Sequence, residues 1–333
     1  MKAVVCRQFG DPRVARLEDV APPPLLPGAV RIEVRACSAS FASLLVMAGR
    51  HQNRAELPLI PGTEIAGIVT ELDADVTRFR IGDRVVAGVQ SGGYAQEAVV
   101  PEQTVFHLPD DIAFEIGAQL PTVYGTAFAA LKWRANLAPG EFLLVHGAAG
   151  GSGLAALEIG KALGATVIAT AGSKEKIAVL AAHGADHAAD HRSDWRGRVL
   201  ELTGGRGADV VYDPVGGDAF DESLRCIAPD GRIIPMGFAS GRIPSVAANI
   251  VLVKNITVIG IYWGYYFGWG RQPVPPGMDA RLREAYRQMF DWIRSGLLSP
   301  RVHAALPLAD FREALRMIAS REVIGRVVML PFG

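Results

Sequence analysis

The pattern of apolar and polar positions changes near residue 140. Before about residue 120, short apolar runs alternate with turns rich in Pro and Gly, as in VRIEVRACS (30–38), EIAGIVTELD (64–73) and the longer run at 83–100. Helical spacing is rare in this part of the chain. Short strands separated by such turns predict a small antiparallel, barrel-like domain.

From residue 142 the pattern alternates between strand and helix. FLLVHG (142–147) is continuously apolar, as is typical of a parallel strand buried on both faces, and apolar residues recur at helical spacing over 152–164. Further strands are predicted at 165–171, 186–190, 208–216, 231–237 and 255–263, and further helices at 174–184, 193–204 and 218–228. Six strands in such an alternation predict a right-handed, doubly wound parallel sheet.

The C-terminal part begins with a Gly- and Pro-rich connection at 264–277. The pattern then predicts a long amphipathic helix over 279–298, followed by another helix and a final strand within 302–331. The predicted fold class is therefore α/β, with a barrel-like domain and a doubly wound sheet.

Composition narrows the class of protein. The chain has 333 residues, 34 basic and 34 acidic side chains and 50% hydrophobic residues, which fits two folded domains and favours neither nucleic acid nor an anionic membrane as partner. No apolar stretch is long enough to span a bilayer, and MKAVVCRQFGDPR has no apolar signal region, so we expect a cytoplasmic protein. Cys6, Cys37 and Cys226 are isolated, which argues against disulfides and a cysteine-rich zinc site.

The strongest chemical signal is the glycine-rich segment HGAAGGSG (146–153). It directly follows a predicted strand and begins a predicted helix, as a dinucleotide-binding turn requires. Gly150 and Gly151 would allow the backbone to approach a pyrophosphate at the helix N-terminus, and Gly153 would allow helix and strand to pack closely. The segment predicts a dinucleotide cofactor, whereas a simple tight turn is the alternative.

The residues after the next strand indicate NADP rather than NAD. Enzymes that use NAD usually carry Asp or Glu there, because a carboxylate accepts hydrogen bonds from the ribose hydroxyls. Here the segment is AGSKEK (171–176), in which hydroxyl and ammonium donors suit a 2′-phosphate. The alternative is an ordinary N-cap at Ser173, followed by a charged first turn.

Several segments together resemble a known family. They are PGTEIAGIV (61–69), RFRIGDRVVAG (78–88), LPTVYGTAFAAL (120–131), VHGAAGGSG (145–153), GADVVYDPVGG (207–217) and MGFASG (236–241). Over nearly its whole length the chain resembles the zinc-free quinone oxidoreductases of the medium-chain dehydrogenase/reductase superfamily. The resemblance implies a GroES-like catalytic domain at 1–122 and 267–333, a Rossmann NADP-binding domain at 123–266, an active site in the cleft between them, and a homodimer.

The resemblance also implies, position by position, the residues that hold NADPH. They comprise a threonine near the nicotinamide, the pyrophosphate turn, the pocket for the adenosine phosphate, loops that line the cofactor, and a C-terminal arginine. In that order they are Thr126; Gly150, Gly151 and Ser152; Gly172, Ser173, Lys176 and His191; Gly216, Gly237, Phe238 and Trp263; and Arg321.

The chain departs from the zinc enzymes of the superfamily. They carry a Cys ligand where this chain has Ser40, and a Gly-His-Glu triplet where it has Gly62-Thr63-Glu64. Without these ligands a catalytic zinc cannot be held in its usual geometry, so we predict no metal. Quinones and α,β-unsaturated carbonyls take a hydride without a Lewis acid, and we therefore expect an NADPH-dependent reductase of a quinone or an activated C=C bond in a small, electrophilic enone or enal.

The expected substrate pocket is atypical. Zinc-free relatives commonly show Asn-Phe-x-Asp and Gly-x-Tyr, where this chain has SFAS (40–43) and GRH (49–51). Ser40, Ser43 and Tyr124 are candidates to hydrogen-bond a carbonyl, and His51 is a candidate proton donor. A pair of serines in a helical turn, a core tyrosine and a surface histidine are the alternatives.

Two other functions stay open at this point. Arg50, Arg54 and Arg271 could serve an acid or CoA substrate, which would make the protein an acrylate or 2-enoyl-CoA reductase. The altered pocket is also compatible with a non-catalytic NADPH-binding protein.

Overall fold

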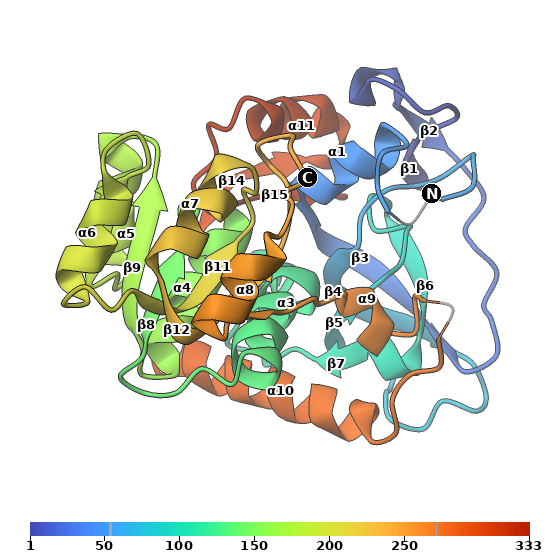
Figure 1. Cartoon of the computed structure of the whole chain (residues 1–333). Helices are drawn as coiled ribbons and strands as arrows, with labels where there is room; N and C mark the ends of the chain where they lie inside the picture. Colours follow the sequence, from blue (N-terminus) through green and yellow to red (C-terminus); the bar gives the residue numbers. More distant parts are fainter. Residues whose placement is uncertain (53–54, 271) are drawn as a thin grey trace. The chain divides into compact units, whose positions relative to one another are not determined.

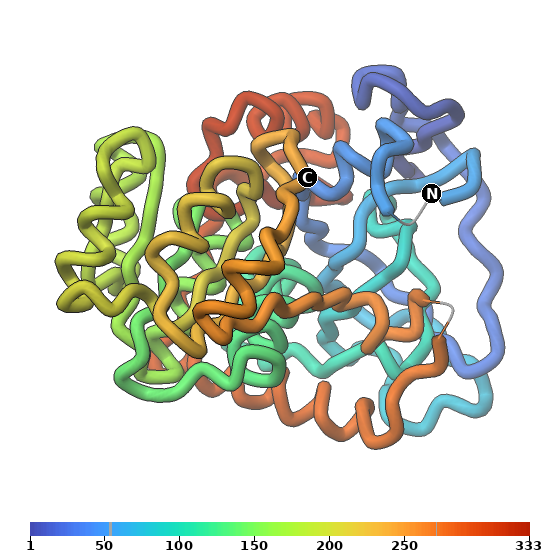
Figure 2. The backbone as a smooth tube through the Cα atoms, viewed as in Figure 1, coloured from blue at the N-terminus to red at the C-terminus, as the bar shows by residue number. Residues whose placement is uncertain are grey.

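The computed structural model describes residues 1–52, 55–270 and 272–333. Its elements form two compact units, labelled along the chain in Figure 1 and traced as a tube in Figure 2. Unit 1 comprises Met1–Thr122, Gly264–Arg287 and Arg301–Gly333, and unit 2 comprises Val123–Trp263 and Gln288–Pro300. Each unit has its own sheet and its own apolar core.

Unit 1 is built on a seven-stranded sheet with the order β14-β15-β3-β4-β5-β7, in which β6 also pairs with β3. The pairings in this sheet are antiparallel except that of β14 with β15, within the residues described. The strands are β3 (Ala29–Ala39), β4 (Glu64–Leu72), β5 (Arg84–Gly88), β6 (Glu97–Pro101), β7 (Val105–His107), β14 (Val302–Pro307) and β15 (Arg326–Leu330). The predicted antiparallel domain is confirmed.

A hairpin and several helices complete unit 1. β1 (Lys2–Val5) and β2 (Arg16–Asp19) form a separate antiparallel pair. The helices are α1 (Phe41–Met47), α2 (Phe114–Gly117) and α11 (Phe311–Ala319). Two more helices cross a unit boundary: α9 (Trp263–Tyr266) and α10 (Met278–Arg294).

The C-terminal strand belongs to the unit 1 sheet. β15 runs antiparallel to β3, with Val327 opposite Ala39 and Met329 opposite Cys37. The prediction for 302–331 contained a single strand, whereas the structure adds β14, whose residues are mostly half-buried and therefore show little apolar alternation. The two ends of the chain contribute to one core.

A buried ion pair ties these distant segments together. The Arg326 guanidinium of β15 donates to the Glu64 carboxylate of β4, and both side chains are almost fully buried. Arg326 Nε also donates to Ser38 Oγ of β3 at 2.8 Å. The second oxygen of Glu64 accepts the backbone N–H of Thr122 at 3.0 Å. One pair of charges thus joins three strands to the last residue of the first unit 1 segment.

Unit 2 is a six-stranded, wholly parallel sheet within the residues described, with the order β10-β9-β8-β11-β12-β13. The strands are β8 (Phe142–Val145), β9 (Thr166–Ala171), β10 (His187–Asp190), β11 (Ala208–Asp213), β12 (Ile227–Pro235) and β13 (Thr257–Val258). The helices between them are α4 (Gly151–Ala162), α5 (Lys174–Ala182), α6 (Trp195–Leu202), α7 (Asp218–Cys226) and α8 (Ala248–Lys254). The predicted Rossmann-type sheet is confirmed.

The strand order places a topological switch point beside β8. The chain passes from β8 to β9 and β10 on one side of the sheet, and then returns to β11 on the other side of β8. In doubly wound sheets, ligands bind beyond the carboxyl ends of the strands at this point. The loop after β8 is the glycine-rich segment.

Residues 288–300 group with unit 2, which differs from the expected boundary. Trp292 packs on Phe128, with ring centroids 5.7 Å apart, and the Ser299 N–H donates to the buried carboxylate of Glu158 at 3.1 Å. The amphipathic spacing of α10 predicts an apolar face, but it does not indicate which unit that face covers. A short α3 (Gly125–Phe128), flanked by wider helical turns at 120–124 and 129–134, was not predicted. Among the residues described, no helix has the length and apolarity needed to cross a membrane.

We predict that Arg326→Met lowers the free energy of unfolding of unit 1 by about 3–5 kcal/mol, because it leaves the Glu64 carboxylate buried without its counter-charge. Calorimetry and urea denaturation measure this loss. Arg316→Met is the matched control, since Arg316 makes an exposed ion pair with Glu313. It should leave the transition nearly unchanged. Equal destabilisation by both substitutions would contradict the role given to the buried pair.

Candidate cofactor and acceptor sites

The glycine-rich turn after β8 leads directly into α4. Gly150 is the N-cap of this helix with extended backbone angles, and its N–H donates to Gly147 O at 3.0 Å. A Cβ on Gly153 would lie 2.5 Å from Gly147 O, so the helix approaches the turn more closely than any other residue permits. The first N–H groups of a helix lack intrahelical acceptors. The Gly150 amide is bound within the turn, and the amides of Gly151 and Ser152 that follow it at the helix N-terminus suit a pyrophosphate.

Four predicted residues lie at the carboxyl ends of β9 and β10. Gly172 follows β9, and a Cβ there would lie 2.7 Å from the ring of His191, which follows β10. Ser173 is the N-cap of α5, and its Oγ accepts the N–H of Lys176 at 3.2 Å. Lys176 is half-buried in the first turn. The cluster combines imidazole, hydroxyl and ammonium groups without a carboxylate directly after β9.

The loops after β11 and β12 also meet. Gly216 has a φ of 67°, and a Cβ there would lie 3.1 Å from the Phe238 ring, while one on Gly237 would lie 3.3 Å from Pro214 O. Asp213 is buried beneath these loops and accepts the N–H of Val215 at 2.8 Å. Burial raises the pKa of this carboxyl group. Asp213 shapes the loop in which Gly216 lies.

Two predicted residues have their polar or aromatic groups inside unit 2. The Tyr124 hydroxyl donates to Glu158 Oε2 at 2.8 Å, and Tyr124 is 1% exposed. Trp263 begins α9 instead of lying in a loop; its ring packs on Gly125, where a Cβ would lie 2.5 Å away. Thr126 lies next in α3 and is half-buried. Tyr124 and Trp263 thus pack the core beside Thr126.

Two buried polar groups in unit 2 were missed by the sequence reasoning. Glu158 is 2% exposed and also accepts from His183 Nδ1 at 2.6 Å. His146, in the glycine-rich turn, is buried between Thr170 Oγ1 at 3.1 Å and Ser223 Oγ at 2.8 Å. A charged residue within the apolar run 154–160 was the available signal for Glu158.

The ring of His146 is neutral and connects strand and helix through hydrogen bonds. Because Ser223 Oγ donates to Ala219 O at 2.6 Å, it accepts from Nε2–H of His146, and Nδ1 accepts from the Thr170 hydroxyl. Burial lowers the pKa of His146 to about 3. The histidine therefore holds the turn in place and carries no charge at neutral pH.

Three of the four candidate acceptor residues, Ser40, Ser43 and His51, lie in unit 1, whereas Tyr124 lies in unit 2. Ser40 is the N-cap of α1, and its Oγ accepts the N–H of Ser43 at 3.1 Å. The two serine hydroxyls are 3.0 Å apart, and Tyr94, which the sequence reasoning missed, donates to Ser43 Oγ at 2.8 Å. His51 follows α1 and is half-buried.

The predicted arginines are spread out. Arg321 follows α11 in unit 1, where it is exposed with a φ of 59°. Arg50 follows α1 and is exposed. Arg54 and Arg271, considered for an acidic substrate, lie outside the residues that the structure describes.

The donor set does not fit a zinc ion. Ser40 and Thr63 offer hydroxyl or backbone oxygens where the zinc enzymes supply thiolate and imidazole, and hydroxyls are poor zinc ligands. Burial raises the pKa of the nearby Cys37 thiol, which keeps it protonated. In the described part of the chain, no three His, Cys, Asp or Glu side chains are grouped to hold a metal.

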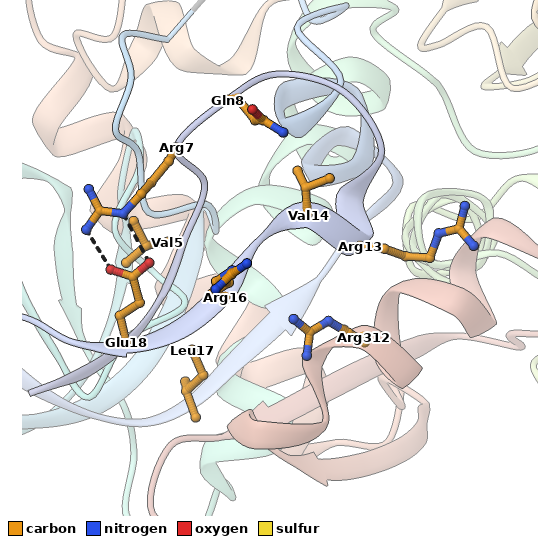
Figure 3. A pocket seen from close by; sticks show the side chains of 9 residues that line it. All are labelled: Val5, Arg7, Gln8, Arg13, Val14, Arg16, Leu17, Glu18 and Arg312. Carbon is orange, nitrogen blue, oxygen red and sulfur yellow. Dashed lines mark hydrogen bonds and ion pairs between the residues drawn. The ribbon is translucent and has the colours of Figure 1, made fainter.

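A hollow of about 730 Å³ lies elsewhere in unit 1 and is shown in Figure 3. Its lining includes Arg7, Arg13, Arg16 and Arg312 and none of the predicted site residues. Arg7 is paired with Glu18 at 2.6 Å and Arg13 with Asp11 at 2.5 Å, so that half of the arginine charge is already compensated. The hollow is separate from the candidate sites.

Comparison with known proteins places this fold. A model described as "Alcohol dehydrogenase GroES-like domain" matches residues 26–110, and one described as "Zinc-binding dehydrogenase" matches residues 151–282. Fold and matches together define an oxidoreductase of the medium-chain dehydrogenase/reductase superfamily.

Individual relatives narrow the assignment. The chain is 40% identical to "Quinone oxidoreductase-like protein 2 homolog" of Nematostella vectensis over 98% of this chain and 88% of the relative. It also matches the crystal structure of Escherichia coli quinone oxidoreductase complexed with NADPH, with 29% identity, a TM-score of 0.90 and coverage of 99% of this chain and 100% of that one. A crystal structure of 2-haloacrylate reductase matches with 29% identity, a TM-score of 0.85 and full coverage of both chains. The chain belongs to the quinone oxidoreductase-like family of this superfamily.

The neutral state of His146 predicts a pH dependence of stability. Its folded pKa lies below the unfolded value of about 6.5, so the unfolded state takes up a proton that the folded state refuses as the pH falls from 6.5 towards 3. In the wild type, His146 should therefore lower the free energy of unfolding by roughly 3–5 kcal/mol across that range. His146→Asn should lack this part of the loss.

Urea denaturation at a series of pH values measures the difference between variant and wild type. His107→Asn is the control, because the His107 side chain is exposed. If both variants show the same dependence of the free energy of unfolding on pH, His146 is not the neutral, buried group responsible for it.

Proposed function

We propose that the protein is an NADPH-dependent reductase that transfers hydride to a quinone or to the activated C=C bond of an enone or enal. The observation that carries the cofactor assignment is the cluster of Gly172, Ser173, Lys176 and His191 at the carboxyl ends of β9 and β10. Family membership supports it, as does the likeness to the Escherichia coli quinone oxidoreductase, whose structure is a complex with NADPH.

The residues of unit 2 fit the cofactor. When bound, NADPH supplies a hydride, which carries two electrons, and a proton from water completes the reduction of the acceptor. In the turn, Gly150 lets the backbone approach the pyrophosphate closely, and Gly151 and Ser152 offer it their amides. Lys176 and Ser173 offer charge-assisted and hydroxyl hydrogen bonds to a 2′-phosphate.

The remaining cofactor residues complete this proposal. Gly216, Gly237 and Phe238 form the paired loops beyond β11 and β12, and Trp263 supports Thr126 through Gly125. We include Arg321 as a phosphate contact only because of the family resemblance. Unit 2 would be the cofactor-binding domain and unit 1 the catalytic domain.

The chemistry of unit 1 favours an acceptor that is already electrophilic. Ser40, backed by Ser43, can donate a hydrogen bond, but neither serine supplies a Lewis acid. A conjugated acceptor spreads the charge of the added hydride onto its oxygen. Tyr124 is left out of the acceptor site because its hydroxyl is held by Glu158. His51 stays as a candidate proton donor.

Two alternatives and a homodimer belong to the same proposal. The 2-haloacrylate reductase among the similar structures favours an acrylate or enoyl thioester as the second choice of acceptor. A non-catalytic NADPH-binding protein is the other alternative. Family membership and the exposed Leu252 and Val253 of α8 support pairing of two chains.

The acceptor class is tested by NADPH oxidation with ortho-quinones, para-quinones, enones, acrylates and enoyl-CoA thioesters. We expect turnover with quinones or enones, because these accept hydride without a metal. Activity confined to acrylates or thioesters would replace the acceptor class. NADPH binding without turnover on any acceptor would favour the non-catalytic alternative.

We predict that Lys176→Ala weakens NADPH binding by about 1.5–3 kcal/mol, or roughly 10- to 150-fold, and NADH binding far less, because only NADPH carries the 2′-phosphate. Isothermal titration with both cofactors measures this selectivity. Lys174→Ala is the matched control, as an exposed lysine in the same helix turn. Equal losses for NADPH and NADH would contradict the assignment of Lys176.

A further inference from the structure

Three hydroxyl groups form a chain at the start of α1 in unit 1. Tyr94 Oη lies 2.8 Å from Ser43 Oγ, and Ser43 Oγ lies 3.0 Å from Ser40 Oγ. Tyr94 and Ser43 are buried, at 0% and 3% exposure, whereas Ser40 is half-buried. These hydrogen-bonded hydroxyls thus run from the core to Ser40, which a ligand can reach.

Counting hydrogens fixes the direction of this chain. Tyr94 has one hydroxyl hydrogen, and its two acceptors are Ser43 Oγ at 2.8 Å and Ser38 O at 3.5 Å. The shorter bond is the stronger one, and a phenol donates better than it accepts, so the hydrogen goes to Ser43. Burial raises the pKa of Tyr94, which keeps that hydrogen in place at neutral pH.

Burial decides the roles of the two serines. Ser43 Oγ accepts from Tyr94, and because Ser43 is buried its own hydrogen needs an acceptor within the protein. Among the described residues Ser40 Oγ is the acceptor in reach of that hydrogen, so Ser43 donates to Ser40 Oγ. Ser40 Oγ also accepts the Ser43 N–H at 3.1 Å, as the N-cap of α1. Both lone pairs of Ser40 Oγ are occupied, and within the described residues nothing accepts its hydroxyl hydrogen.

We propose that Tyr94 is a positioning residue which, through Ser43, makes the Ser40 hydroxyl an obligate hydrogen-bond donor to the carbonyl or quinone oxygen of the acceptor. The role of the acceptor oxygen rests on the proposed function. The site selects ligands with an accepting oxygen and disfavours groups that can only donate, because Ser40 has no lone pair left to receive a hydrogen.

The chain of hydroxyls orients a donor and does not supply a net proton. Tyr94 keeps its hydrogen, so the proton that completes reduction comes from solvent. A fixed donor gains strength as negative charge develops on the acceptor oxygen. Its effect therefore falls mainly on kcat and little on the binding of NADPH.

A double-mutant cycle tests the coupling. Ser40→Ala should lower kcat/KM for an enone by about 10- to 100-fold, and Tyr94→Phe by a smaller factor of roughly 3–10, because Ser43 can then turn either way. Combined with Ser40→Ala, Tyr94→Phe should cause no further loss, since it acts only through Ser40. Ser40→Thr keeps the hydroxyl and should retain most of the activity.

Controls separate this role from stability. Tyr286→Phe removes another buried hydroxyl of unit 1, which donates to Pro121 O at 2.8 Å, and its effect should multiply with that of Ser40→Ala. Ser43→Ala replaces Tyr94→Phe if the latter does not fold, and its loss should likewise vanish in the Ser40→Ala background. Losses of Tyr94→Phe and Ser40→Ala that multiply would overturn the proposal.

A second readout does not require turnover. Cyclohexanone labelled with carbon-13 at the carbonyl is added to the protein with NADP⁺, and its carbonyl stretch is measured by difference infrared spectroscopy. We expect a downshifted band in the wild type, a smaller shift in Tyr94→Phe and none in Ser40→Ala. If this pattern is found but the protein has no reductase activity, the proposed function is wrong and the assignment of Ser40 as a hydrogen-bond donor stands. A wild-type spectrum without a downshifted band, or with the same band in Ser40→Ala, overturns the assignment.

Discussion

The buried ion pair between Glu64 and Arg326 is the constraint on which unit 1 depends. A carboxylate and a guanidinium without water are tolerated only when each satisfies the other and its remaining groups find partners. Here Ser38 and the Thr122 N–H fill those places. The pair thereby determines where β15 joins β3, and with it the end of β3 at which α1 begins.

This constraint connects packing to chemistry. Ser40 caps α1 immediately after β3, so the position of its hydroxyl follows from the position of that strand. Tyr94 reaches the same place and contacts both Ser38 O and Ser43 Oγ. A site built on a strand end and a helix cap is more rigid than one built on a loop. In unit 2 the backbone has the corresponding role: its glycines allow turns and loops to pack closely, which suits the proposed cofactor.

Much of the fold could be predicted from the sequence, because buried parallel strands and turns leave local patterns. The six strands of unit 2 and the glycine turn lie where the apolar runs placed them. The close approach of Gly172 and His191 fits residues that the family resemblance had grouped, although they are distant in sequence. β13, however, has two residues where the apolar run suggested a longer strand.

The features that could not be predicted are hydrogen bonds and ion pairs between side chains that are far apart in the sequence. His146 meets Ser223, Arg326 meets Glu64, and Tyr94 meets Ser43 only after the sheets have formed. Periodicity reports which face of an element is buried, but it does not report which polar groups satisfy one another there. For the same reason Tyr124 looked available for a substrate, whereas its hydroxyl is held by Glu158.

Hydride transfer from NADPH to a conjugated carbonyl acceptor is the step on which the proposed function depends, and isotope transfer measures it. The purified protein is incubated with an enone and NADPH carrying deuterium at C4 of the nicotinamide, separately for each of its two faces. We expect deuterium from one face to appear on the β-carbon of the saturated ketone, with one NADP⁺ formed for each product molecule. NADPH that binds but leaves no deuterium in any acceptor product would contradict it.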